Sequence, residues 1–186
     1  MTGVVRSDAG ARMQPADLKK TIREVPDFPK AGINFYDIST LLQDGTAFRT
    51  AVDYMVEQFR GRPIDMLAGI EARGFVVAAA MAYRMQLGLI MVRKYGKLPW
   101  KTEGETYELE YGRAEIEIHQ DAVTQGQRVL VVDDLLATGG TAAAAGRLID
   151  RMGGSLAGYA FLVELGFLEG RGQLGDGEVF SLLHYE

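Results

Sequence analysis

The sequence contains no cysteine, and this absence removes several classes of protein. Without thiols the chain can form no disulfide, no zinc–thiolate site and no cysteine nucleophile. The lack of cysteine fits a reducing compartment, so we expect a cytoplasmic protein. Histidine is also scarce: the two residues, His119 and His184, do not lie at a metal-ligand spacing from nearby acids. We therefore expect both histidines to be structural.

Long apolar runs and an excess of positive charge are also lacking. No hydrophobic stretch approaches the roughly 20 residues that a membrane-spanning helix needs, and the first residues lack the apolar core of a signal peptide. The 20 basic and 25 acidic residues give a net charge of −5, which disfavours general binding to nucleic acid. A local basic pocket can still bind a small anion. We therefore expect neither a membrane nor a nucleic acid as a partner.

Length and composition predict one folded domain. The 186 residues are 47% hydrophobic and their mean hydropathy is −0.02, so the chain can bury a sizeable core. We expect residues 1–13 to form a flexible tail and residues 14–186 to form a single domain.

Hydrophobic periodicity predicts helices that alternate with strands. Apolar residues at helical spacing predict helices over residues 17–25, 46–60, 75–86 and 141–152. Short apolar runs predict strands over residues 65–70, 88–93, 128–132, 156–163 and 179–183. A polar loop over residues 94–106 precedes a predicted hairpin that turns near Gly112. This alternation is typical of an α/β fold with a central, mainly parallel sheet flanked by helices.

One segment, VLVVDDLLATGGT (129–141), joins a predicted strand to a predicted helix through a polar loop. Amide groups at a helix start bind anions, and glycine lets the backbone approach a phosphate closely. Thr138 and Thr141 can donate hydroxyl hydrogen bonds. Asp133 and Asp134 can hold ribose hydroxyls or a metal ion. These features together predict a site for a phosphorylated sugar.

Other interpretations of this segment exist. The two acids could be solvated loop residues or a metal pair of another kind, although two adjacent carboxylates repel and need a compensating partner. The loop could be an ordinary turn between a strand and a helix. It lacks the Gly-Lys-Ser/Thr ending of a Walker A loop, which disfavours ATP hydrolysis.

Three polar segments follow predicted parallel strands. They are EARG (71–74), RKYGK (93–97) and DDLLATGGT (133–141). Ligands of such sheets bind beyond the carboxyl ends of the strands. We therefore expect the three segments to form one site.

The segment VVDDLLATGGT resembles the phosphoribosyl pyrophosphate (PRPP) motif of type I phosphoribosyltransferases. Further segments resemble the adenine-specific members of that family and occur in the same order. They are PDFPKAGINFYDIS (26–39), AGIEARGF (68–75), VRKYGKLPW (92–100), YELEYGRAEIEIHQDA (107–122), VELGFLEGR (163–171) and FSLLHYE (180–186). The resemblance covers almost the whole chain beyond residue 15. It implies the type I phosphoribosyltransferase fold, with a small N-terminal hood at about residues 15–45 and a mobile flap at about residues 95–112.

The resemblance also implies an activity. Such enzymes transfer the 5-phosphoribosyl group from PRPP to adenine, giving AMP and pyrophosphate, in purine salvage. The expected cofactor is Mg²⁺, and the expected assembly is a homodimer.

The resemblance assigns roles to residues of the strand-end segments. The residues implied to bind the 5′-phosphate are Ala137, Thr138, Gly139, Gly140 and Thr141. Asp133 and Asp134 are implied to bind the ribose hydroxyls and to contact metal indirectly, through water or PRPP. The residues implied to bind pyrophosphate are Glu71, Ala72, Arg73, Arg93 and Lys97, with Arg73 also catalytic and Lys97 open to donation from a partner subunit. A cis peptide is implied between Glu71 and Ala72.

Two further groups come from the same resemblance. In the flap, Glu110 is implied to be catalytic, either by stabilising a cationic sugar or by managing a proton on adenine, and Tyr111 lies beside it. The residues implied to form the adenine pocket are Ile33, Asn34, Phe35, Tyr36 and Leu165. Many relatives carry an aliphatic residue and an arginine where this chain has Asn34 and Tyr36. Side-chain roles at those two positions are therefore open.

Two rival functions remain at this point. The same fold could act on hypoxanthine, xanthine or guanine, but relatives for these bases usually present a lysine or an acid where this chain has Leu165. A non-enzymatic PRPP sensor of transcription should carry a DNA-binding region or lose the flap carboxylate. This chain is acidic and keeps Glu110.

Overall fold

The computed structural model describes residues 13–108 and 112–186. The chain divides into two compact units, the first ending at Thr50 and the second beginning at Ala51. Within the described ranges, no helix combines the length and the apolar character that crossing a membrane requires.

The first unit contains short elements. They are α1 (Pro15–Lys19), β1 (Arg23–Val25), β2 (Phe35–Asp37) and α2 (Ser39–Gln43). The helix expected over residues 17–25 is wrong in its second half, because it ends at Lys19 and residues 23–25 form a strand. β1 pairs with β2 in antiparallel fashion, and Val25 lies opposite Phe35. Pro26 explains the difference, since a residue before proline is disfavoured in helical conformation.

Helix α3 (Gly45–Gln58) begins in the first unit and ends in the second. The Asp44 side chain accepts hydrogen bonds from the backbone N–H groups of Thr46 (2.9 Å) and Ala47 (3.0 Å). This cap satisfies two of the amide groups that a helix start leaves without partners. The helix expected over residues 46–60 is therefore confirmed.

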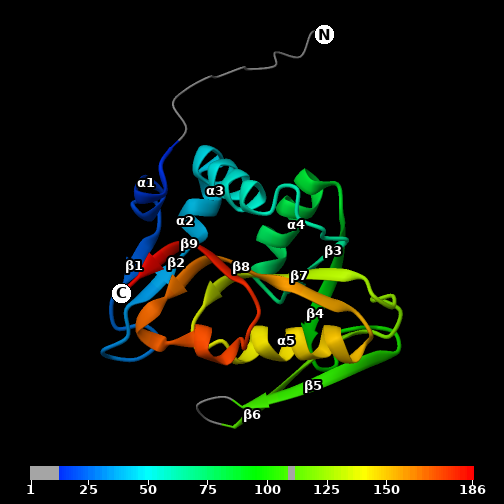
Figure 1. The fold of residues 1–186 in the computed structure, drawn as a ribbon. Helices are drawn as coiled ribbons and strands as arrows, with labels where there is room; N and C mark the ends of the chain where they lie inside the picture. Colours follow the sequence, from blue (N-terminus) through cyan, green and yellow to red (C-terminus); the bar gives the residue numbers. More distant parts are fainter. Residues whose placement is uncertain (1–12, 109–111) are drawn as a thin grey trace. The chain divides into compact units, whose positions relative to one another are not determined.

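The second unit contains a seven-stranded sheet within the described residues, in the order β5-β6-β4-β3-β7-β8-β9 (Figure 1). Its strands are β3 (Met66–Ile70), β4 (Gly88–Lys94), β5 (Thr102–Glu108), β6 (Arg113–His119), β7 (Arg128–Leu136), β8 (Ser155–Leu165) and β9 (Val179–Tyr185). Each neighbouring pair in the series β4-β3-β7-β8-β9 is parallel, whereas β6 pairs with β4 and β5 in antiparallel fashion. The expected mainly parallel sheet is confirmed.

Helices cover the sheet of the second unit. They are α4 (Gly74–Met85) and α5 (Gly140–Arg151), with the short 3₁₀ helices η1 (Gly166–Leu168) and η2 (Gly170–Gln173) after β8. α4 and α5 lie on opposite sides of the sheet (Figure 1). Strands covered on both faces are expected to be apolar throughout, as residues 129–132 are.

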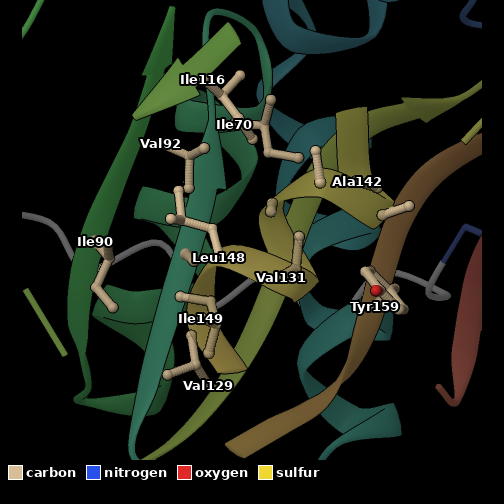
Figure 2. Packing of buried hydrophobic residues seen from close by; sticks show 14 of the residues in the cluster. Ile70, Ile90, Val92, Ile116, Val129, Val131, Ala142, Leu148, Ile149 and Tyr159 are labelled. Atoms are coloured by element: carbon tan, nitrogen blue, oxygen red, sulfur yellow. The ribbon is translucent and has the colours of Figure 1, made fainter. Parts of the chain in front are cut away.

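One cluster of the hydrophobic core lies between α5 and the sheet. Val129 and Val131 point from β7 toward Leu148 and Ile149 of α5 (Figure 2). The run Ala142–Ala145 is also buried, and its small side chains let the helix lie close to the strands. Burying each large aliphatic side chain contributes about 1.5–3 kcal/mol to the free energy of folding. This contact therefore holds α5 against the sheet.

Strands β5 and β7 extend beyond the bounds that the sequence indicated. β7 runs to Leu136 because its pairing with β8 continues as far as Leu136 opposite Glu164. Asp133 and Asp134 therefore lie within a strand and not in the loop after it. β5 begins at Thr102, inside the expected loop 94–106, because it pairs with β6 although its sequence is polar.

Strand β5 is joined to α5 by ion pairs. Arg147 Nε donates to Glu105 Oε1 at 2.8 Å, and the Arg151 guanidinium also contacts Glu105. The hydrogen bond from Arg147 lowers the pKa of the Glu105 carboxyl, although its burial acts in the opposite direction. These contacts connect the strand that leads into residues 109–111 to the helix that begins at Gly140.

We predict that Glu105→Gln lowers the free energy of unfolding by about 1 kcal/mol near neutral pH, because it replaces a charged acceptor of two arginines. The pKa of Glu105 is depressed in the folded state, so its contribution is present above the unfolded pKa of about 4.3. It is lost as pH falls through the folded value. Urea unfolding of both proteins across acid pH measures this difference, and a gap that stays constant down to about pH 2 would contradict it.

Candidate phosphosugar site

The three polar strand-end segments meet at one edge of the sheet. β3 lies between β4 and β7, with Ile70 opposite Val92 and Gly69 opposite Val132. All three strands run in the same direction, so the segments 71–74, 93–97 and 133–141 start from neighbouring strand ends. The expected convergence is confirmed.

A first hollow of about 80 Å³ lies between the end of β7 and the start of α5. Its lining comprises Asp133, Leu135, Leu136, Ala137, Thr138, Gly139, Gly140, Thr141, Ala142 and Phe161. Gly139 adopts φ 83° and is the N-cap of α5, whose first turn carries no acidic residue. A 12-residue helix that starts at this loop directs its positive end into the hollow. We call residues 137–141 the phosphate nest.

The two aspartates have different surroundings. Asp134 is 6% exposed, and its Oδ2 atom lies 2.7 Å from Arg73 Nε. That ion pair lacks the alignment of a hydrogen bond, and Asp134 Oδ2 receives no other hydrogen bond from the described residues. Asp133 accepts a 2.8 Å hydrogen bond from the backbone N–H of Asp134 and lines both hollows of the site.

The Asp133 carboxyl has a pKa well above its usual range, because burial disfavours its charged form and Asp134 repels it. A cation or a hydroxyl donor placed beside Asp133 would relieve both effects. The aspartate pair therefore favours a ligand that brings such groups.

Arg73 precedes α4 and reaches back across the site to Asp134. The peptide between Glu71 and Ala72 is cis, as the family resemblance implied. Gly74 is a residue that the sequence did not single out. A Cβ atom there would lie 2.5 Å from Asp133 Oδ1 and 3.0 Å from Asp133 Cα, so only glycine allows α4 to start this close to β7.

A second hollow of about 210 Å³ adjoins the first and contains residues from all three segments. It is lined by Ile70, Glu71, Val92, Lys94, Tyr107, Ile116, Asp133 and Thr141. Aliphatic side chains thus share the lining with carboxylate, ammonium and hydroxyl groups. Asp133 and Thr141 belong to both hollows, so one ligand could span them.

The basic residues Arg93 and Lys94, at the end of β4, make different contacts. Lys94 lines the second hollow, whereas Arg93 donates hydrogen bonds to both Glu71 carboxylate oxygens (3.1 and 3.2 Å) and to the carbonyl of Lys97 (2.9 Å). The hydrogen bond from Arg93 lowers the pKa of Glu71, although partial burial raises it. In this arrangement Arg93 connects two loops of the site. The buried Glu117 carboxylate accepts hydrogen bonds from the backbone N–H groups of Lys97 (3.2 Å) and Leu98 (3.1 Å).

The residues expected in the adenine pocket belong to both units. Ile33 is exposed, the Phe35 ring lies 5.2 Å from that of Phe28, and Asn34 Nδ2 donates to Glu24 at 2.8 Å. Tyr36 lies in β2, in the first unit with these residues, and Leu165 is the last residue of β8 in the second. The pocket stays a prediction. Glu110 and Tyr111 lie outside the described residues.

The histidines have structural surroundings. His184 Nδ1 lies 3.3 Å from a Glu164 carboxylate oxygen, and the His119 ring lies 6.3 Å from that of Trp100. Across residues 13–108 and 112–186, no group of three or more histidine or acidic side chains could hold a metal ion. Any metal at the two aspartates would therefore need ligands from water or substrate.

Comparison with known proteins relates this geometry to a family. The model of the phosphoribosyl transferase domain matches residues 39–174. The adenine phosphoribosyltransferase of Desulfitobacterium hafniense is 56% identical over 93% of this chain and 100% of its own length. The chain belongs to the adenine phosphoribosyltransferase family. The corresponding protein of Acidobacterium capsulatum is 54% identical over 90% of this chain and 93% of its own.

Solved structures of family members agree. The adenine phosphoribosyltransferase of Thermoanaerobacter pseudethanolicus has a TM-score of 0.90 at 47% identity, covering 92% of this chain and 100% of its own. The Saccharomyces cerevisiae enzyme, in complex with an imino-altritol bisphosphate and adenine, has a TM-score of 0.86 at 39% identity, covering 91% and 98%. The type I phosphoribosyltransferase fold implied by the family resemblance is confirmed.

Proposed function

We propose that this chain transfers the 5-phosphoribosyl group of PRPP to adenine, forming AMP and pyrophosphate in purine salvage. The observation that carries this proposal is the pair of adjoining hollows at the end of β7, which share Asp133 and Thr141. One hollow has the chemistry of a phosphate site. The other has polar groups from all three strand-end segments around an aliphatic surface, which suits a sugar and its leaving group.

The phosphate nest holds the 5′-phosphate in this proposal. The positive end of α5 faces it, and the hydroxyls of Thr138 and Thr141 add donors. Asp133 and Asp134 then accept hydrogen bonds from the ribose hydroxyls. Such donors stabilise a carboxylate whose pKa burial and repulsion have raised.

The aspartates also fit an indirect magnesium site. Carboxylate oxygens are ligands that Mg²⁺ prefers, and Mg²⁺ usually keeps several waters and binds through substrate phosphates. The buried Asp134 carboxylate, one oxygen of which lacks an aligned hydrogen bond, and the half-buried Asp133 carboxylate match that preference. When bound with PRPP, Mg²⁺ would neutralise charge on the departing pyrophosphate.

Residues of the segments 71–74 and 93–97, which both contribute to the lining of the second hollow, bind pyrophosphate in this proposal. Arg73 supplies paired donors, Glu71 and Ala72 supply the loop backbone, and Arg93 and Lys97 supply positive charge. Arg93 donates hydrogen bonds to Glu71 in the structure. To bind pyrophosphate, its guanidinium must therefore either contact both groups at once or leave Glu71. Lys94, which lines the hollow, joins this set.

The rest of the reaction is assigned to the hood and the flap of a single domain over residues 14–186. Ile33, Asn34, Phe35, Tyr36 and Leu165 hold adenine. Glu110, beside Tyr111, stabilises the positive charge that develops on the sugar as the bond to pyrophosphate breaks. Closure of the flap over the reacting groups excludes water, which would otherwise compete with adenine.

The decisive test removes charge from the aspartate pair. The double change Asp133→Asn and Asp134→Asn should lower kcat/KM for AMP formation by about 100-fold or more. The neutral asparagine side chains accept weaker hydrogen bonds from the ribose hydroxyls and attract a metal ion less strongly. Asp121→Asn is the matched control, since Asp121 is exposed in the turn after β6. Unfolding midpoints close to that of the unchanged protein would establish that the fold is intact, and undiminished turnover would overturn the assignment.

The same assay separates the two rivals. Turnover with adenine, hypoxanthine, xanthine and guanine measures base preference, and adenine should be strongly favoured. A protein that binds PRPP but forms no AMP would be a sensor and not an enzyme.

Arg73→Ala should raise KM for PRPP by about 10-fold or more, equivalent to about 1.4 kcal/mol, with a smaller effect on adenine. The substitution removes the planar donors and also leaves Asp134 without its ion-pair partner. Arg73→Lys restores the charge but not the paired donors, so it should recover only part of the loss. Equal increases in KM for PRPP and adenine would count against the pyrophosphate role.

A homodimer is the proposed assembly, and α4 offers apolar surface for it. Val76 is 44% exposed and Tyr83 is 85% exposed. These residues are seven positions apart, so they lie on one face of the helix two turns apart. We assign these two exposed residues to the proposed dimer interface.

Tyr83→Lys should therefore raise the dimer dissociation constant by about 10-fold or more, because it places a charge in the interface. Tyr83→Phe keeps the apolar surface and serves as the control. Sedimentation over a range of concentrations measures the change. An unchanged dimer in Tyr83→Lys would exclude this face.

A further inference from the structure

The short segment between β8 and η2 passes behind the phosphate nest. It starts at Leu165, at the end of β8, and reaches Gly170, the first residue of η2. The residues on either side of this segment, Glu164 and Arg171, are joined to each other. We call this pair the staple.

The staple has close, two-point geometry. Arg171 Nε donates to Glu164 Oε1 at 2.6 Å, and Arg171 Nη2 donates to Glu164 Oε2 at 2.7 Å. Arg171 Nη1 also donates to the carbonyl of Val179 at 3.1 Å. Glu164 is 6% exposed, so the pair is largely shielded from water on the carboxylate side. A guanidinium held at three points fixes the position of the backbone that carries it.

Glu164 is the fixed end of the staple. It lies in the sheet, opposite Leu136 of β7 and His184 of β9. Leu165 is also held by the sheet, opposite Tyr185. Gly170 lies outside the sheet. Its neighbour Arg171 connects η2 to Glu164 of β8, and Leu174, directly after η2, is buried in the core.

The backbone of Gly170 lies against that of the phosphate nest. A Cβ atom on Gly139 would clash with the carbonyl oxygen of Gly170, and a Cβ atom on Gly170 would clash with the carbonyl oxygen of Ala137. Such an atom on Gly170 would also lie 3.1 Å from the backbone nitrogen of Gly139. The two glycines thus permit backbone contact between η2 and the nest.

We propose that Arg171, anchored by Glu164, is a positioning residue for the 5′-phosphate. It holds Gly170 against Ala137 and Gly139, and this support keeps the nest in the shape that binds phosphate. The inference rests on the proposed function, because it takes the nest to be the phosphate site. It assigns no contact between Arg171 and the ligand.

A partly buried ion pair can also serve stability alone, so the test must separate the two roles. Arg171→Lys keeps the positive charge and loses the two-point geometry. It should raise the dissociation constants of ribose 5-phosphate and AMP by about 10-fold, measured by calorimetry, and raise KM for PRPP to a similar extent. KM for adenine should change by less than about 2-fold, because the sheet holds Leu165 independently of the staple.

The chain provides a matched control at the opposite end of β7. Arg128 forms the same kind of pair with Asp65, through Nε at 2.8 Å and Nη2 at 2.6 Å. Arg128→Lys should lower stability without changing ribose 5-phosphate affinity. Glu164→Gln, which keeps the shape of the anchor and loses its charge, should shift phosphate affinity in the same direction as Arg171→Lys.

Gly170→Ala tests the backbone contact without touching the staple, and it should weaken ribose 5-phosphate through the clash with Ala137. If Arg171→Lys fails to fold, the ribose 5-phosphate affinity of Gly170→Ala tests the inference in its place. Unaltered phosphate affinity in the folded variants overturns the inference, as does an equal loss for adenine and PRPP. Failure of the unmodified protein to bind ribose 5-phosphate or form AMP would refute the proposed function itself.

Discussion

The parallel pairing of β7 with β3 on one side and β8 on the other is the constraint on which the site depends. Together with the pairing of β3 with β4, it places the starts of three polar segments at one edge. Because pairing with β8 continues to Leu136, it also holds both aspartates in extended backbone immediately before the nest. The buried contact of α5 with β7 then fixes the helix whose positive end faces the same hollow.

Charge within this frame is unevenly distributed. Asp134 is buried and paired with Arg73, whereas Asp133 is left to face both hollows with a raised pKa. Glu71 and Arg93 neutralise each other and join the loops after β3 and β4. The site therefore has a carboxyl whose charged form is disfavoured where hydroxyls or a cation are proposed to bind, and Lys94 adds positive charge to the lining of the second hollow. This arrangement suits a ligand with a diol beside phosphate groups.

Local patterns predicted much of the fold. The apolar runs of β3, β4, β7 and β8 and the apolar stripe of α3 were sufficient to predict that these elements exist, because burial dictates both the residue types and their spacing. Two strands could not be predicted from local patterns, because they depend on pairing with a neighbour. Arg23–Val25 forms a strand because it pairs with β2, and the polar segment Thr102–Glu108 forms one because it pairs with β6. In the site, the nest and the aspartates were visible in sequence. Gly74 and Gly170 were not, because their importance arises from a backbone distant along the chain.

The contact between Gly139 and Gly170 restricts how this protein can change over evolutionary time. Neither position accepts a methyl group while the opposing backbone stays in place. In each case the clash is with a backbone atom, which no substitution at the opposite glycine removes. The two positions, 31 residues apart, should therefore each remain glycine independently of the other among descendants of this sequence.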